Sequence, residues 1–461
     1  MRTLVTTVLL LTLCVAGFAQ GHFHFAGPMS QFLPEGGVPG TVTGGLPFAV
    51  VLTDAGATLA PTSFDFQPEG WEGKATLTLA DVKFADGRLT ATVRLSNDTK
   101  APLEGLRLDI TGATEEYKAK DDQGQDILKT RAQAVGIASP LLLGDVAKRD
   151  SADPQPLDAG PIVFQPETTK ITVTGVLSGL YYAGMIKPPV DAQVFSLDFD
   201  PQGRLNMALR AKNDLYRCDP DGQNAVPTAK LPKYAPGNMA VDPLNGDLLA
   251  TSYAIYRFSA DGAPKEVLSS LAGPTADRLR GYGRVIRFDP KGNLYVGDDA
   301  FLACYFDNQR LWAVDRIGEY RFNSGLVFDV DREGKLWVAD AVPSALYTMG
   351  RKGEGARRVT AGADWHLGAI TEPRAVRIDA HGNVYVVEGS INKPDKKEVQ
   401  RVSVFDAQGR IVRVFGRADR SPAKTGLMEG QLSPLASDLA FGPDGRIFLA
   451  NSNMIMIFRP F

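Results

Sequence analysis

One short sequence phrase occurs six times in the C-terminal part of this 461-residue chain. Each copy has an apolar stretch, a turn that ends in Gly, and a second apolar stretch that ends in a polar residue. The turn glycines are Gly203, Gly246, Gly292, Gly334, Gly382 and Gly445. A hairpin repeat of this length is typical of a β-propeller, because one blade cannot bury its own faces and must stack on its neighbours. The sequence therefore predicts an all-β fold with a six-bladed β-propeller over residues 187–461.

A second hairpin, whose turn also ends in Gly, follows most copies of the phrase, which gives four strands per blade. In the third repeat this second turn is expected at 316–318. The sixth copy has room for only one more strand before the chain ends at Phe461. A closed ring leaves no long sheet edge unpaired. The missing outer strand is therefore expected to come from residues 171–185, which precede the first repeat.

The N-terminal part of the chain lacks the repeat and is expected to form separate units. Residues 1–19 have a basic start, an apolar core and a Gly-Phe-Ala ending, which together predict a cleaved secretory signal peptide. Residues 20–70 are rich in Gly and Pro and are expected to be extended or loosely packed. Residues 71–186 contain alternating stretches at 75–84, 88–95, 103–110 and 171–177, which predict a β-sandwich domain.

Composition narrows the functional classes. Hydrophobic residues make up 44% of the chain and the net charge is −3, whereas nucleic-acid-binding proteins usually carry a basic face. We therefore expect no nucleic-acid partner, and no segment after the signal peptide is apolar enough to span a membrane. The signal peptide predicts a secreted or periplasmic protein. Cys218 and Cys304 lie in non-adjacent repeats and are expected to remain unpaired.

The connections between the predicted strands fall into two groups. The turns inside each hairpin are short and project from one face of the propeller, which we call the short-turn face. Longer connections, expected at 273–284, 300–310, 389–400 and 417–437, project from the opposite long-loop face. Binding residues concentrate on long loops held by a rigid scaffold, so the sequence predicts a site on the long-loop face near the central channel.

The repeat phrase resembles the NHL repeat. The stretches KLWVAD (335–340), NLYVGD (293–298) and RVSVFDAQGRIVRVFG (401–416) carry this resemblance, which implies a six-bladed toroid. NHL proteins range from ligand-binding and protein-binding modules to lyases, and gluconolactonase-like propellers share the geometry. The stretch at 88–110 resembles the Ig-like modules of bacterial exported proteins.

Polar residues end the second strand of several repeats at the predicted channel rim. Three carboxylates and a carboxamide could together coordinate Ca²⁺, which prefers six to eight oxygen ligands. They could instead cap nearby backbone amides as a regular part of the repeat, which is the commoner role. These positions are Asp298, Asp340, Glu388 and Asn451.

Further residues on the predicted long loops could contact a ligand or take part in catalysis. His366 is a candidate acid–base group, and Arg374 could hold a carboxylate in a bidentate manner. The expected ligand-binding face comprises Arg284, Asp299, Tyr305, Trp365, His366 and Arg374.

Two functions from different classes fit these residues. The first is an exported module that binds an unknown protein or small molecule through the long-loop face. The alternative is a gluconolactonase-like, metal-dependent hydrolase or lyase with Asp298, Asp340 and Glu388 around the metal. The first repeat offers Leu209 and Arg210 where the gluconolactonase-like group has an acidic residue, which puts the enzyme in doubt. A purely architectural envelope protein is a third possibility.

Overall fold

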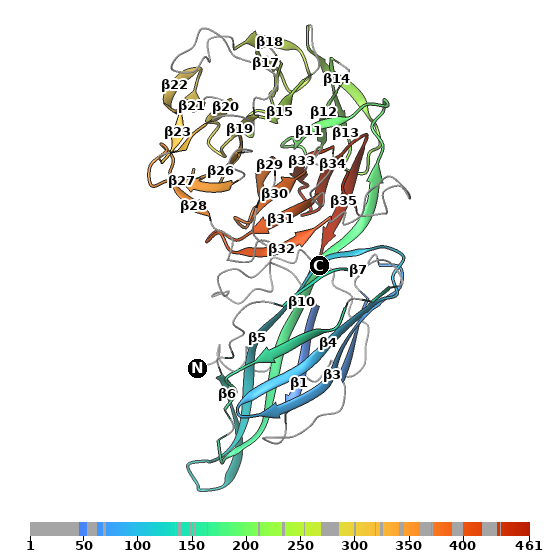
Figure 1. Ribbon diagram of the computed structural model, residues 1–461, viewed down its shortest axis with the longest axis vertical. Coiled ribbons are helices and arrows are strands. Elements are labelled where there is room, and N and C mark those ends of the chain that lie inside the picture. Colours follow the sequence, from blue (N-terminus) through green and yellow to red (C-terminus); the bar gives the residue numbers. More distant parts are fainter. Residues whose placement is uncertain are drawn as a thin grey trace, which may run out of the picture.

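Figure 1 shows the computed structural model, in which β-strands run through an upper ring and a lower, elongated unit. Within the described residues there is no helix, and hence none that could cross a membrane. The predicted signal peptide lies outside the described residues. The structure describes residues 46–52, 62–67, 71–133, 135, 141–146, 150–151, 153–163, 165–210, 213–232, 236–252, 254–268, 285–298, 301–318, 320–322, 326–340, 345–359, 370, 372–389, 400–416, 431–433 and 435–461.

The upper ring is built from antiparallel four-stranded sheets, each formed by consecutive strands. The first sheet contains β11 (Val194–Phe199), β12 (Leu205–Leu209), β13 (Asp214–Cys218) and β14 (Val226–Lys230). The second contains β15 (Asn238–Val241), β16 (Leu248–Thr251), β17 (Ile255–Phe258) and β18 (Pro264–Val267). The third contains β19 (Val285–Phe288), β20 (Leu294–Asp298), β21 (Phe301–Phe306) and β22 (Gln309–Val314). The next two are β25 (Val327–Val330) to β28 (Arg357–Val359), with β26 (Leu336–Asp340) and β27 (Ala345–Met349), and β29 (Pro373–Ile378) to β32 (Ile411–Phe415), with β30 (Val384–Glu388) and β31 (Arg401–Phe405).

The innermost strands of these sheets form a closed ring. Each contacts the next in the order β11, β15, β19, β25, β29 and β33 (Ala436–Phe441), and β33 contacts β11 again. Sheets that stack around a common axis in this way define a β-propeller. The predicted propeller is therefore present.

Alternation along the innermost strands explains why the sheets stack. Leu197, Ile286, Phe328 and Val376 are fully buried. The residues on either side of them point to the opposite face of the same sheet; Ala375, for example, is buried in a different apolar cluster from Val376. The tight turn that follows is built by an aspartate and a glycine. In β11–β12, Asp200 Oδ1 accepts hydrogen bonds from the amides of residues 202 and 204, at 3.0 and 2.9 Å, and Gly203 has a φ of 76°.

The final sheet of the ring takes its outer strand from the N-terminal half of the chain. Its order is β33, β34 (Ile447–Asn451), β35 (Met454–Pro460) and β10 (Thr168–Ile186). Strand β10 pairs with β35 in a register that runs from Leu180 opposite Pro460 to Ile186 opposite Ile455. This pairing confirms the predicted contribution of residues 171–185 to ring closure.

The lower unit consists of two sheets around one apolar core. In the first, β10 continues away from the ring and pairs with β1 (Leu46–Leu52) and β5 (Leu103–Lys120), and β5 also pairs with β6 (Asp126–Gln133) and β7 (Leu141–Val146). The second sheet contains β2 (Thr62–Phe66), β3 (Ala75–Ala85) and β4 (Arg88–Asn97), with β8 (Asp150–Ser151) and β9 (Gln155–Ala159) on β4.

Two strands of the lower unit lie in residues 20–70, the segment that was expected to be extended or loosely packed. Strand β1 pairs with β10 along its whole length, and β2 pairs with β3. Phe48, Val50 and Leu52 are buried in the common core. Alternating apolar residues outweigh the Gly and Pro content of this segment, so its described part belongs to the sheets.

The third sheet of the ring differs from the sequence-based prediction. Residues 301–306 form β21 and pair with β20, whereas a long connection was expected at 300–310. The true turn is formed by Asp307 and Asn308, which have φ angles of 47° and 60°. Residues 316–318, where a turn was predicted, instead contain the strand β23 (Arg316–Ile317), which pairs with β24 (Tyr320–Arg321) in a separate ribbon.

The two cysteines of the propeller are both free and buried. Cys218 ends β13, and Cys304 lies in β21. The prediction that they remain unpaired is confirmed.

Candidate functional site

The polar residues that were predicted at the channel rim end four second strands of the ring. Each of them is at least 95% buried in the structure. Arg284, Asp299, Trp365 and His366 lie outside the described residues. The four described positions are Asp298 on β20, Asp340 on β26, Glu388 on β30 and Asn451 on β34.

The contacts of two of these residues match a structural role. Glu388 Oε1 accepts a hydrogen bond from Arg401 Nε at 3.1 Å and another from the Ser403 hydroxyl. Asn451 Oδ1 accepts from the Ser433 amide at 2.7 Å. No group of three or more His, Cys, Asp or Glu side chains among the described residues is placed to hold a metal ion. The Ca²⁺ site therefore stays a prediction.

Arg374 lies at the start of β29, where the strand carries a β-bulge between Pro373 and Ala375. Its side chain is 35% exposed, and its Nη2 lies 3.5 Å from Glu372 Oε2. The neighbouring inner strands β33 and β11 carry a bulge at the equivalent place. Bulges change the direction of nearby side chains at the edges of sheets. Side chains at the start of these three strands therefore point in directions that regular strand pairing would not allow.

Tyr305 was predicted on a long loop of the ligand-binding face. It lies instead inside β21, is 2% exposed, and pairs with Leu294 close to the Asp307–Asn308 turn. That turn lies on the short-turn face, so Tyr305 packs in the core of its sheet rather than on the long-loop face.

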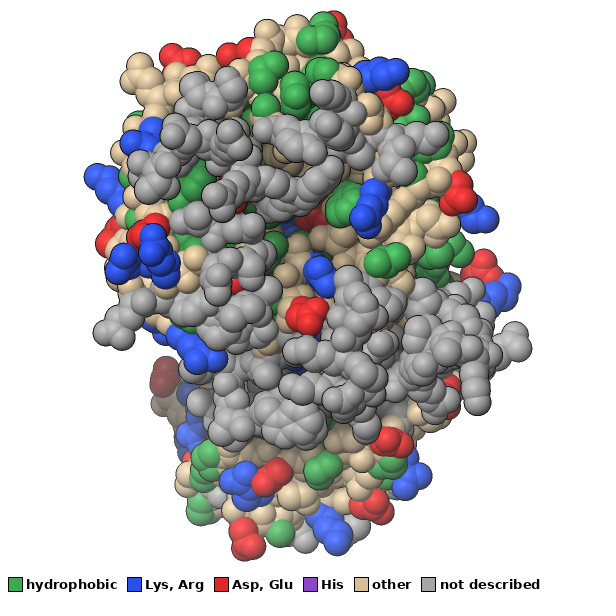
Figure 2. Space-filling view, turned by 45° about the horizontal axis from the view of Figure 1, so that its top comes forward, with side chains coloured by type: hydrophobic (Ala, Val, Ile, Leu, Met, Phe, Trp, Pro, Cys, Tyr) green, Lys and Arg blue, Asp and Glu red, His purple; other side chains and the backbone are tan. Residues whose placement is uncertain are grey.

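The structure brings together a cluster of charged residues that sequence reasoning missed. Their side chains project from the innermost strands of the ring, and most of them are buried. We call this set the axis cluster; its members are Asp198 on β11, Arg287 on β19, Asp329 on β25, Arg377 on β29 and Asp438 on β33. The acidic and basic side chains that Figure 2 shows on one face of the molecule are, by contrast, those at its surface.

Asp438 is the centre of the axis cluster. Its carboxylate accepts hydrogen bonds from Arg377 Nε and Nη2 at 3.0 and 2.9 Å, and from Ser196 Oγ at 2.7 Å. Arg287 Nη2 approaches the same carboxylate to 3.5 Å. Strands β19 and β33 are not neighbours in the ring, so the contact between Arg287 and Asp438 crosses the axis.

Two further contacts tie the cluster to the backbone of adjacent sheets. Asp198 Oδ2 accepts from the Val241 amide at 2.9 Å, and Asp329 Oδ2 accepts from the Ile378 amide at 2.8 Å. Each carboxylate therefore links its own innermost strand to the next one in the ring. Such links fix the positions of adjacent sheets as well as balancing charge.

Burial has the largest influence on the pKa of each buried member of the axis cluster. It raises the pKa of Asp329 and lowers that of Arg287. For Asp438, the charges of Arg377 and Arg287 outweigh burial and hold the pKa below its usual value. Asp438 in turn keeps the pKa of Arg377 above its usual value, against the effect of burial. The central pair is therefore ionised at neutral pH.

A periodic signal in the sequence could have revealed four members of the axis cluster, but not Asp438, which occupies another position of its repeat. Asp198, Arg287, Asp329 and Arg377 each stand two residues before the aspartate that opens the hairpin turn. The same repeat position in each innermost strand faces its neighbours in the same way. Charges of both signs at one repeat position therefore indicate pairing across the ring.

The chain matches no protein-family model, and no curated protein matches it. Solved structures with related shapes include a streptogramin B lyase structure, with a TM-score of 0.42 and 11% identity, covering 62% of this chain and 98% of that one. A nidogen/laminin complex gives 0.38 and 18%, covering 52% and 93%. A structural genomics protein of unknown function from Bacteroides thetaiotaomicron gives 0.44 and 11%, covering 81% and 94%. At these levels of similarity, none of them assigns a function to this chain.

Proposed function

We propose that the protein is an exported, six-bladed, NHL-like propeller with an Ig-like β-sandwich at its N-terminus, and that it binds a small molecule or a protein through its long-loop face. The observation that carries this proposal is the asymmetry of the connections. The two inner strands of each sheet are joined by tight turns, whereas Phe415 at the end of β32 and Ala436 at the start of β33 are joined by a long connection. Long connections on a rigid scaffold are where proteins place binding residues.

The axis cluster supports a site on a face rather than inside the channel. The contact between Arg287 and Asp438 spans the axis at 3.5 Å, and Arg377 Nη2 reaches the carbonyl of Leu197 on β11 at 2.6 Å. These charged groups engage one another rather than a ligand, although Arg287 Nε has no hydrogen-bond partner. Arg374, with its partly exposed guanidinium on the long-loop face, is the described residue best placed to contact an anionic group of a ligand.

A ligand screen by thermal unfolding tests the proposal. Wild-type protein would be screened against a panel of metabolites, since a ligand that binds only the folded state raises Tm. The best hit would then be titrated into Arg374→Ala and into a matched control, Arg332→Ala, which changes an exposed arginine in a tight turn of the short-turn face.

We expect the ligand-induced rise in Tm to be reduced in Arg374→Ala and retained in Arg332→Ala. Loss of the response in Arg332→Ala together with its retention in Arg374→Ala would place binding on the opposite face and refute the proposal.

A further inference from the structure

Arg413 is a buried arginine at the junction between the propeller and the lower unit. It lies on β32, which packs against β5, and it is only 2% exposed. Its stem crosses Gly105 so closely that a Cβ there would come within 2.5 Å of Arg413 Cγ. Nη2 donates a hydrogen bond to Ser178 Oγ at 3.2 Å, but Nε has no hydrogen-bond partner. No salt bridge joins Arg413 to an acidic residue of the described chain.

A second buried arginine lies on the other side of Ser178. Arg107 on β5 is 5% exposed and stands directly opposite Ser178 in the pairing of β5 with β10. Its Nε and Nη2 each donate to Asp109 at 2.7 Å, while Nη1 has no partner. Ser178 therefore places two guanidinium groups near each other, and each has one N–H nitrogen that is buried and unsatisfied.

No acidic group of the junction, among the described residues, forms a salt bridge with Arg413. Asp109 is engaged by Arg107, and Glu104 accepts a hydrogen bond from the Gly416 amide at 2.8 Å. Burial lowers the pKa of Arg413 to about 10, and the charge of Arg107 acts in the same direction. The charges of Asp109 and Asp379 oppose this shift, but neither carboxylate forms a salt bridge with Arg413. Arg413 is still cationic at neutral pH, so its positive charge is buried with no carboxylate in direct contact.

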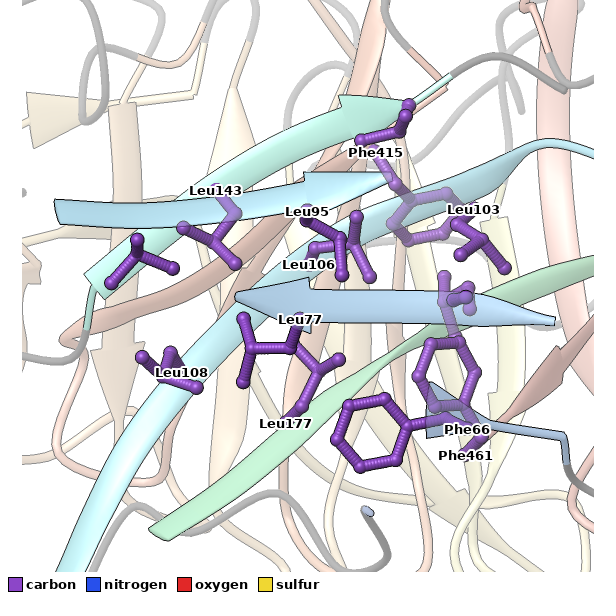
Figure 3. Packing of buried hydrophobic residues seen from close by; sticks show 14 of the residues in the cluster. Phe66, Leu77, Leu95, Leu103, Leu106, Leu108, Leu143, Leu177, Phe415 and Phe461 are labelled. Atoms are coloured by element: carbon purple, nitrogen blue, oxygen red, sulfur yellow. The ribbon is translucent and has the colours of Figure 1, made fainter. Parts of the chain in front are cut away.

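The surroundings prevent bulk water from solvating these groups. Figure 3 shows the ring of Phe415, two residues after Arg413, beside Leu103 and Leu106 of β5. All three side chains are buried in the core that the propeller and the lower unit share. Buried N–H groups in native proteins are almost always satisfied by protein, ordered water or a bound ion, and two like charges favour an ion of opposite sign.

We propose that a small inorganic anion of the chloride class binds between Arg107 and Arg413 and links the propeller to the lower unit. The anion would accept hydrogen bonds from Arg413 Nε and Arg107 Nη1. Large oxyanions and organic carboxylates are disfavoured, because the site is enclosed by packed strands. This site lies at the junction and not on the long-loop face, so it goes beyond the proposed function and does not depend on it.

Bromide identifies the site directly, because it replaces chloride and scatters anomalously. Crystals of the wild-type protein grown with sodium bromide are expected to show an anomalous peak between the two guanidinium groups. Bromide peaks elsewhere on the molecule, together with water or no density between Arg107 and Arg413, would overturn the proposal.

Thermal unfolding at constant ionic strength gives a second, independent measurement. Replacing sodium gluconate by sodium chloride should raise the Tm of the wild type by roughly a few degrees, with a saturable dependence on chloride. Arg413→Met should abolish this dependence. The matched control is Arg217→Met. Arg217 is also buried and also has an unsatisfied nitrogen, but its Nε forms a salt bridge with Asp200.

The control should keep the chloride dependence whatever its own Tm. The anion site would be refuted if the Tm of the wild type did not change with chloride concentration, or if the Tm of Arg413→Met still depended on chloride. The wild-type titration and the bromide experiment decide the question even if Arg413→Met fails to fold.

Discussion

Replacing Asp438 by Asn would remove the carboxylate that pairs with Arg377 and faces Arg287 across the propeller axis. The amide keeps the size of the side chain and can still accept from Ser196, so the change is mainly one of charge. Asp438 is 1% exposed, and its hydrogen bonds to Arg377 are 2.9 and 3.0 Å long. Removing one partner of a buried ion pair typically costs about 3 to 5 kcal/mol, because the remaining charge stays buried.

We therefore expect Asp438→Asn to lower the free energy of unfolding by about 3 to 5 kcal/mol. The measurement is urea unfolding followed by the fluorescence of Trp337, which is buried in the fourth sheet of the ring. The matched control is Asp444→Asn, which breaks an exposed pair with Arg446 in the turn after β33. Exposed pairs contribute little, so the control should change stability by less than about 1 kcal/mol.

A double-variant cycle separates charge from packing. Adding Arg377→Met to Asp438→Asn removes the charge that the first change leaves uncompensated, so the double variant should lose less stability than the sum of the single variants. Equal effects of Asp438→Asn and Asp444→Asn, or simple additivity in the cycle, would show that the axis cluster does not stabilise the ring by charge pairing.

Three further outcomes are expected. The hydrogen bond from Arg131 is the main reason that the pKa of the buried Glu115 carboxylate is lowered to about 2. The stabilisation from this carboxylate is complete above its unfolded-state pKa and is lost as the pH falls toward 2. The difference in stability between wild type and Glu115→Gln should therefore shrink from pH 5 to pH 2, and a constant difference would contradict this. Burial raises the pKa of Cys218 to about 12 and of Cys304 to about 11, so neither thiol should react with a disulfide reagent at pH 8 until the protein is unfolded, and rapid labelling of the native state would argue against their burial. Because Glu388 is engaged by an arginine, purified protein should carry no stoichiometric Ca²⁺; a stoichiometric ion that is lost in Glu388→Ala would favour the metal-dependent enzyme.

Two features of the fold could be predicted from the sequence: the repeated hairpins, and the strand that completes the last, incomplete sheet. The hairpin phrase predicted the propeller, and the short last repeat predicted the pairing of β10 with β35, because an incomplete sheet needs a strand from elsewhere. The turn at Asp307 and Asn308 was missed because two non-glycine residues adopt positive φ there. A glycine was expected at such a turn, so the turn was predicted too late in the sequence. Residues 300–310, including Tyr305, were therefore predicted to form a loop instead of β21.

The functional groups were harder to predict than the strands. Glu388 was recognised as a polar residue at the rim, but its partner Arg401 lies beyond a long connection, so pattern alone could not pair them. The contact between Arg287 and Asp438 joins residues that are far apart in sequence and on opposite sides of the ring. Such pairs depend on how the sheets close around the axis, which the spacing of individual repeats does not specify.

Strand β10 has a consequence for the order in which the molecule can be completed. It pairs with β1 and β5 at one end and with β35 at the other. Its last partner, β35, comes from the opposite end of the propeller sequence (Met454–Pro460). During synthesis the half of β10 that faces the propeller therefore has to wait until β35 has been translated. A variant that lacks β35 would leave that edge open to neighbouring molecules, which is a common route to aggregation.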